Sequence, residues 1–185
     1  MHNRHGFCVV LCLALMLAFI RPLGAAEGHP DRTISLWFKP ADTEGRQVLY
    51  AEGHVSLGFT LYLDGDSLYG GSWAGPRRQW SGHWLRHEGI EPARWYHAAL
   101  VLEGTTTEVK EEKLHLYVDG ERVDSGPGVR VPRSYAPPRV GRGDLYAGAN
   151  VYPKYHDDNE RRGEGRPFRG RMDDFRLINA ALRHE

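Results

Sequence analysis

The chain has 185 residues, in which 24 Lys and Arg side chains are balanced by 24 Asp and Glu side chains. Removal of a predicted leader that carries Arg4 and Arg21 leaves a slight acidic excess, which argues against nucleic acid as a partner. The length fits one globular domain that buries roughly two thirds of its unfolded surface.

The first 26 residues have the order of a secretory signal peptide. Arg4 and His5 precede an unbroken apolar run over residues 7–20, and the small residues of 24–26 follow it. The apolar run is short for a membrane span, and no later run is long enough for a transmembrane helix. We therefore predict cleavage after Ala26, a secreted or periplasmic product with no stable membrane anchor, and a single domain over residues 27–185.

Both cysteines, Cys8 and Cys12, lie inside the predicted leader. The mature chain can therefore form neither a disulfide nor a cysteine-ligated metal site. Its stability must come from an ordinary apolar core, and the sequence predicts no required cofactor.

Apolar and polar residues alternate in most segments after Asp31, with the two-residue period of a β-strand. Asp64-Gly65-Asp66 and Asp119-Gly120 are predicted to be hairpin turns between such segments. Residues 95–102 are apolar on both parities, which predicts a central strand covered on both faces. The segments that we predict to be strands are 33–39, 47–51, 58–63, 67–71, 95–102 and 168–178, and residues 113–123 are predicted to form a hairpin about Asp119-Gly120.

The last predicted strand changes parity, since Met172 lies on one face and Phe175 and Leu177 on the other. A β-bulge near Asp173-Asp174 would bring all three side chains inward. Many short strands with no sustained helical period predict an all-β, antiparallel jelly-roll β-sandwich. Two polar and aromatic stretches, 72–94 and 143–166, interrupt the strand pattern, and we predict that they are binding loops.

Four segments in this order resemble the bacterial laminin-G-like, or concanavalin-A-like, jelly-roll domain. They are TISLWFKP (33–40), WYHAALVL (95–102), LHLYVDGERV (114–123) and FRGRMDDFRLINAAL (168–182). The resemblance implies a β-sandwich of the lectin and glucanase type. The family pattern includes another strand before the first of these segments, so we predict that the sheet edge there is bare or is covered by a different strand. Some relatives bind calcium at the sandwich rim.

The stretch 72–94 concentrates aromatic and histidine side chains, which are Trp73, Trp80, His83, Trp84 and His87. An aromatic ring stacks on the apolar face of a sugar, and neighbouring polar groups bind its hydroxyls. This composition predicts a carbohydrate platform. The alternative interpretation, that the tryptophans pack the loop onto the sandwich, stays open.

The stretch 143–166 contains the second candidate group. Its aromatic members are Tyr146, Tyr152 and Tyr155, which we predict to bind the same carbohydrate ligand. Asp157 and Asp158 are candidate calcium ligands together with Asp173 and Asp174, because carboxylates suit hard cations. The sequence favours a solvated acidic turn for the first pair and a bulge-supporting role for the second.

Catalytic motifs are weak in this chain. No paired-carboxylate run of the glucanase type is present, and Asp119 and Glu121 are better explained by turn chemistry. His97 and His115 alternate with apolar strand residues, which favours a hydrogen-bonded structural role. The sequence thus predicts a secreted, non-catalytic module that recognises a glycan. The alternatives are a domain that binds an extracellular protein and, less favoured, a glycoside hydrolase or lyase.

Overall fold

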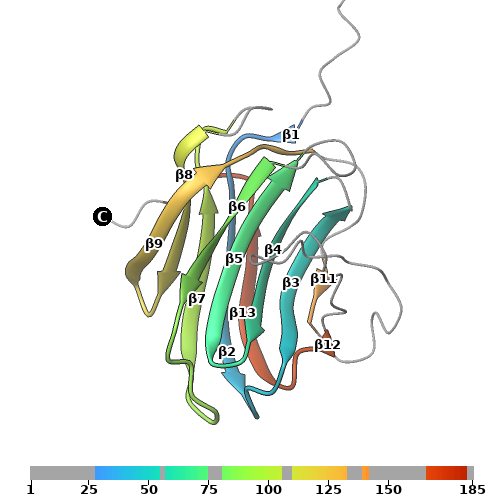
Figure 1. Ribbon diagram of the computed structural model, residues 1–185, viewed down its shortest axis with the longest axis vertical. Coiled ribbons are helices and arrows are strands. Elements are labelled where there is room, and N and C mark those ends of the chain that lie inside the picture. The colour runs from blue at the N-terminus through green and yellow to red at the C-terminus, as the bar shows by residue number, and fades with distance from the viewer. Residues whose placement is uncertain are drawn as a thin grey trace, which may run out of the picture.

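The computed structural model describes residues 28–54, 57–74, 81–105, 110–132, 139–141 and 166–182. These residues form strands and turns and contain no helix (Figure 1). No helix in this part of the chain could therefore cross a membrane. The strands are β1 (Gly28–His29), β2 (Arg32–Pro40), β3 (Arg46–His54), β4 (Leu57–Asp64), β5 (Ser67–Ala74), β6 (Ser81–His87), β7 (Tyr96–Leu102), β8 (Lys110–Val118), β9 (Glu121–Gly128), β10 (Val131–Pro132), β11 (Arg139–Val140), β12 (Arg166–Pro167) and β13 (Gly170–Ile178).

Two main sheets stack face to face. One has the order β11-β3-β4-β5-β6, with β12 paired in parallel to β3, and the other has the order β13-β2-β7-β8-β9. β1 and β10 form a separate antiparallel pair. Figure 1 shows β3 to β6 in front of the sheet that contains β2, β7 and β13. The all-β sandwich predicted from the alternating pattern is confirmed.

The core lies between the sheets and takes one parity from each strand. In β2, Ile34, Leu36 and Phe38 are fully buried, as are alternate residues of β4 in the other sheet. Burial of each such side chain contributes about 1.5–3 kcal/mol. The alternation seen in the sequence therefore gives each sheet one apolar face, and the two apolar faces close on each other.

The predicted hairpins are confirmed. Gly65 and Asp66 connect β4 to β5, and Asp119 and Gly120 connect β8 to β9. Asp119 and Gly120 both have positive φ, at 51° and 87°. A two-residue hairpin turn of this hand needs positive φ at both positions, which Asp-Gly tolerates well.

β13 bears on two predictions, the bulge near Asp173-Asp174 and the uncovered sheet edge beside the first strand. Its register against β2 shifts between Asp173 and Arg176, so that Met172 and Phe175 both pack against the core. The bulge is therefore where the parity change indicated it. β2 lies between β13 and β7 in its sheet. The edge of β2 that was expected to be bare or covered by a different strand is therefore covered by the C-terminal strand, β13.

The predicted loop over residues 72–94 is wrong in extent. Ser72 to Ala74 belong to β5, and Ser81 to His87 form β6, which pairs with β5. The prediction failed because Gly, Ser and His interrupt the apolar alternation, while the backbone ladder requires no particular side chain.

The prediction for 95–102 also needs correction. β7 is central, but His97 and Ala99 are only half-buried on its outer side.

A buried ion pair joins the two sheets. Arg32 begins β2 with the same parity as the core residues, and its Nε donates to Glu52 Oε1 on β3 at 2.6 Å, with a second contact from Nη2 to Oε2. The side chains are 6% and 7% exposed. Nη1 also donates to Asn179, just after β13. One guanidinium therefore ties both sheets to the C-terminal segment.

Candidate functional site

The outer face of the sheet β3–β6 carries two pairs of stacked rings. The ring centroids of Tyr62 and Tyr69 are 5.3 Å apart, and those of Trp73 and Trp84 are 6.1 Å apart. Tyr62, Tyr69 and Trp73 are buried, with Trp73 only 1% exposed. The Trp73 indole therefore does not present an open face for stacking.

Two glycines explain why these indoles lie close to the sheet. A Cβ on Gly58 would lie 2.2 Å from the Trp73 ring, and a Cβ on Gly71 would lie 2.5 Å from Trp84 Nε1. Each glycine thus leaves the space that an indole on the neighbouring strand occupies. The packing interpretation describes Trp73 well, whereas His83 is exposed and Trp84 half-buried.

Several predicted ligand residues lie outside the described part of the chain. For these the sequence-based assignments remain predictions; they are Trp80, Tyr146, Tyr152, Tyr155, Asp157 and Asp158.

Asp173 and Asp174 are described, and both act within the bulge. Asp173 Oδ1 accepts a hydrogen bond from the Asp174 amide at 2.8 Å, and Asp174 pairs with Arg176 at 2.8 Å. Within the described ranges, no group of three or more His, Asp or Glu side chains is placed to hold a metal ion. These contacts are those of a bulge-supporting role, and calcium binding stays a prediction.

The outer face of the sheet β13-β2-β7-β8-β9 differs, because it exposes its large aromatic residues. Trp37 on β2 is 41% exposed, and Trp95, just before β7, is 39% exposed. Trp37 pairs with Asp173 on one side and with His97 on the other, so these three side chains project to the same side of the sheet. We call this surface the Trp37 face.

Hydrogen bonds hold the centre of the Trp37 face. His97 lies against the Trp37 ring with a centroid distance of 5.2 Å and a tilt of 48°. Its Nε2 is 2.8 Å from Ser35 Oγ, and its backbone amide donates to Asp119 Oδ1 at 2.8 Å. The predicted structural roles of His97 and of Asp119 are thus confirmed. Together these contacts fix the imidazole that supports Trp37.

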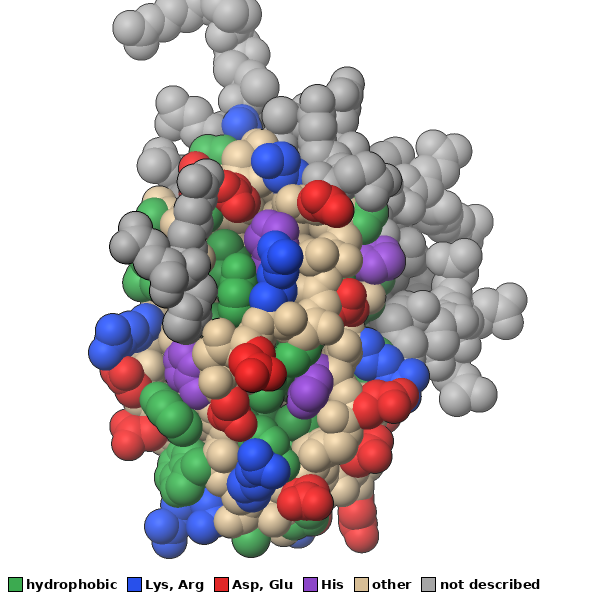
Figure 2. All heavy atoms as spheres, turned by 90° about the vertical axis from the view of Figure 1, so that its left-hand side faces the viewer, with side chains coloured by type: hydrophobic (Ala, Val, Ile, Leu, Met, Phe, Trp, Pro, Cys, Tyr) green, Lys and Arg blue, Asp and Glu red, His purple; other side chains and the backbone are tan. Residues whose placement is uncertain are grey.

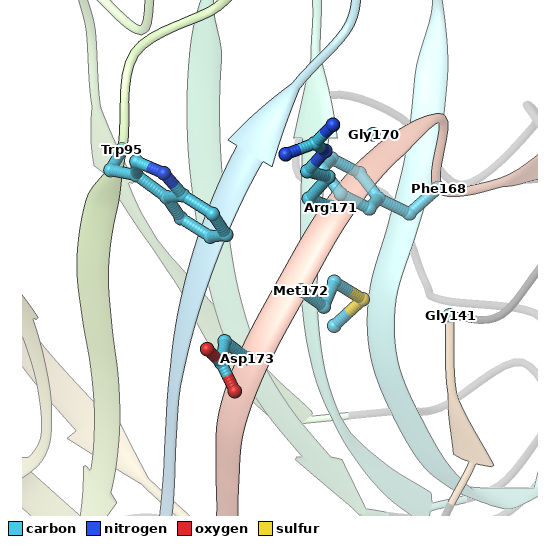
Figure 3. A pocket seen from close by; sticks show the side chains of 7 residues that line it. All are labelled: Trp95, Gly141, Phe168, Gly170, Arg171, Met172 and Asp173. Atoms are coloured by element: carbon cyan, nitrogen blue, oxygen red, sulfur yellow. The ribbon is translucent and has the colours of Figure 1, made fainter.

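A hollow of about 520 Å³ lies at one end of this face, beside the edge strand β13. Its lining residues are Trp95, Gly141, Phe168, Gly170, Arg171, Met172 and Asp173. Figure 3 shows the Trp95 indole reaching across β2, with Arg171 and Asp173 on the same side of β13 and Met172 on the other. This edge hollow therefore combines an indole with one cation and one anion.

A second hollow, of about 270 Å³, lies farther along the same face, and we call it the β7 hollow. Ser35 and Ala99, which pair across β2 and β7, form its floor because their side chains are small. Its other lining residues are Thr33, His97, Val101, Tyr117, Gly120 and Leu182. Leu182 is held at its side by a hydrogen bond from its amide to Thr33 Oγ1 at 3.1 Å.

The charges on the described surface are mixed. Figure 2 shows acidic and basic side chains interspersed on one flank, with histidines between them and apolar groups in small areas. This flank therefore has no patch of a single sign that would attract a polyanion.

The sequence contained part of the signal for the Trp37 face. Alternation in 33–39 placed Ser35, Trp37 and Lys39 opposite the core residues. Reasoning from the sequence missed Trp95, Arg171 and Asp173 as one group, because Trp95 is about 75 positions away in the chain from the other two. Only strand order brings them together.

A family model described as the concanavalin A-like lectin/glucanases superfamily matches residues 25–185. The chain belongs to this superfamily. The resemblance carried by the four ordered segments is thereby confirmed, and the match begins next to the predicted cleavage site. No curated protein matches the chain.

Solved structures share the fold of this superfamily member. A putative carbohydrate-binding protein from Bacteroides ovatus matches with a TM-score of 0.53 and 16% identity, covering 87% of this chain and 40% of that one. Domain 4 of AbnA, an extracellular arabinanase from Geobacillus stearothermophilus solved with arabinotriose, matches with a TM-score of 0.52 and 18% identity, covering 85% and 64%.

A carbohydrate-binding module of a Ruminococcus gnavus sialidase, bound to sialyllactose, matches with a TM-score of 0.51 and 14% identity, covering 85% of this chain and 80% of that one. The chain thus spans 40% and 64% of the first two structures. At these identities the matches establish the β-sandwich fold of the chain.

Proposed function

We propose that this superfamily member is an exported, non-catalytic module that binds carbohydrate through the Trp37 face. The observation that carries the proposal is the pair of exposed tryptophans, Trp37 and Trp95, on one sheet face beside the edge hollow. Exposed apolar side chains that gather on one surface mark a binding site, and an indole suits the apolar face of a sugar ring.

The polar groups around Trp95 complete a sugar site. Arg171 offers several N–H donors, and Asp173 has one carboxylate oxygen beyond the one that accepts the Asp174 amide. Sugar hydroxyls both donate and accept, so a cation and an anion on one wall can bind adjacent hydroxyls. The lining of the edge hollow balances one cation with one anion, which favours an uncharged glycan.

The number of carboxylates that line the two hollows supports a binding role rather than hydrolysis. Glycosidases place two carboxyl groups on either side of the scissile bond. Among the described residues that line the two hollows, Asp173 is the single carboxylate. Export is supported by the leader pattern of residues 1–26 and by a family match that starts where this pattern ends.

The test is a glycan array followed by calorimetry with the best ligand, on the mature protein and three variants. Trp37→Ala and Trp95→Ala should each weaken binding about tenfold or more, because each removes a stacking ring. Arg86→Ala is the matched control, since Arg86 is exposed on the other sheet. Equal binding by all variants would show that another surface holds the glycan.

The two predicted loops are the competing location for the same function. Trp80→Ala and Tyr152→Ala test them in the same assay. Loss of binding in these variants, with Trp37→Ala unaffected, would move the site to 72–94 and 143–166.

A protein surface is the second candidate ligand. Exposed Trp together with Arg, as in Trp95 and Arg171, is also the composition of protein–protein hot spots. A purified extracellular partner whose binding depends on Trp95 and is unaffected by competing sugars would favour this alternative.

A further inference from the structure

We infer that the glycan is a linear chain bound along its interior, running from the edge hollow across Trp37 and His97 into the β7 hollow. The inference rests on the proposed function. It specifies the class of ligand, an internal stretch of a polysaccharide rather than a terminal sugar.

The two hollows belong to one continuous surface. Trp37 pairs with Asp173, which lines the edge hollow, and with His97, which lines the β7 hollow. Paired residues of antiparallel strands project to the same side of a sheet. Trp37 therefore stands between Asp173 of the edge hollow and His97 of the β7 hollow, and its partly exposed indole joins the two hollows.

The combined length of the two adjoining hollows sets the size of the ligand. Trp95 and Ala99 are four residues apart, and β7 begins between them at Tyr96. At the rise of an extended strand this separation corresponds to roughly 14 Å along the sheet. A single sugar ring cannot contact both Trp95 and Ala99 at that distance, whereas a short linear oligosaccharide can.

The chemistry along this path also suits a chain. Indoles at Trp95 and Trp37 provide stacking surfaces, and among the residues that line the two hollows the charged ones, Arg171 and Asp173, both belong to the edge hollow. The lining of the β7 hollow consists of small, apolar and hydroxyl side chains with one histidine. A single terminal sugar would contact only part of the path from Trp95 to Ala99. A chain gains from both hollows, because linked units share a single loss of translational freedom.

The experiment compares sugars of increasing length. Arabinan, xylan and mixed-linkage glucan are screened as probes, and the series from monosaccharide to hexasaccharide of each polysaccharide that binds is titrated by calorimetry. We expect affinity to rise about tenfold or more from the monosaccharide to the longer members and then to level off. Blocking of the non-reducing end by methylation should leave affinity for the longest member unchanged.

Two variants separate the hollows. Trp95→Ala damages the edge hollow, and Ala99→Leu fills the β7 hollow, because Ala99 is half-buried and faces outward. Each should weaken binding of the hexasaccharide about tenfold or more and bring it close to that of the shorter sugars. Arg86→Ala is the control, and circular dichroism with thermal unfolding checks that each variant is folded.

The outcomes distinguish the inference from the proposed function. A monosaccharide that binds as tightly as the hexasaccharide, or a hexasaccharide unaffected by Ala99→Leu, overturns the extended path while carbohydrate binding stands. Failure of every sugar in the screen to bind refutes the proposed function and the inference with it.

Discussion

Removal of Arg32 should destabilise this protein strongly, because it leaves the Glu52 carboxylate buried without its partner. The Glu52 side chain is 7% exposed and receives two N–H groups of the guanidinium. Removal of one member of a buried ion pair costs about 3–5 kcal/mol. We therefore expect Arg32→Met to lose that amount, which is a large part of the 5–15 kcal/mol typical of a domain.

Replacement of both charges should have a much smaller effect. In the double variant Arg32→Met with Glu52→Leu no charge is left to desolvate, and such replacements are often neutral or stabilising. The expected coupling between the two sites is therefore a few kcal/mol. Arg86→Met is the matched control, because the Arg86–Glu88 pair is 51% and 65% exposed and should contribute about 1 kcal/mol or less.

The loss in the free energy of unfolding caused by Arg32→Met, here called the deficit, should depend on pH. Burial raises the pKa of Glu52, and Arg32 opposes this effect in the native protein. Without Arg32 the folded-state pKa rises further above the unfolded-state pKa. Above the folded-state pKa the deficit is fully present, and it shrinks as pH falls toward the unfolded-state pKa, because the folded variant takes up a proton more readily.

Urea unfolding followed by tryptophan fluorescence measures these free energies. The reasoning is refuted if Arg32→Met and Glu52→Leu each lose less than about 1 kcal/mol, or if their losses simply add in the double variant. A deficit that grows on acidification would contradict the assigned sign of the Glu52 pKa shift.

Three further predictions concern single positions. Gly58→Ala should cost about 1–3 kcal/mol in urea unfolding, because its Cβ would meet the Trp73 ring at 2.2 Å. Burial lowers the pKa of His115, so stability should fall as pH drops below the unfolded-state pKa, and His115→Gln should reduce this loss in unfolding curves recorded between about pH 8 and pH 5. Asp119→Ala should lower the melting temperature, since Asp119 has φ 51° and loses its bond to the His97 amide; an unchanged value would refute the turn role.

Much of the fold could be predicted from local pattern. Ile34, Leu36 and Phe38 share a parity, and a β-strand places alternate residues on one face, so their common burial follows from their spacing. The turn at Asp119-Gly120 and the bulge beside Met172 were predictable for similar reasons. Each depends on residues that are close together in the chain.

The candidate site was harder to predict. The density of tryptophan in 72–94 indicated a binding loop, yet Trp73 is buried, while exposed Trp37 and Trp95 lie in segments that first indicated strands. The buried Trp73 and the exposed Trp37 and Trp95 have the same apolar side chain. Whether an indole is covered depends on which elements lie beside it, and neighbouring residues in the chain do not determine that.

By itself the sequence determined the parity of each strand, the hairpin turns and the membership of the superfamily, because these depend on spacing and on ordered motifs. The tertiary structure decided which charges meet and which aromatics stay in solvent. Arg32 and Glu52 are 20 positions apart, and Trp95 is about 75 positions from Arg171. Such pairs form only when strand order places their β-strands side by side or face to face, and that order is a property of the whole chain.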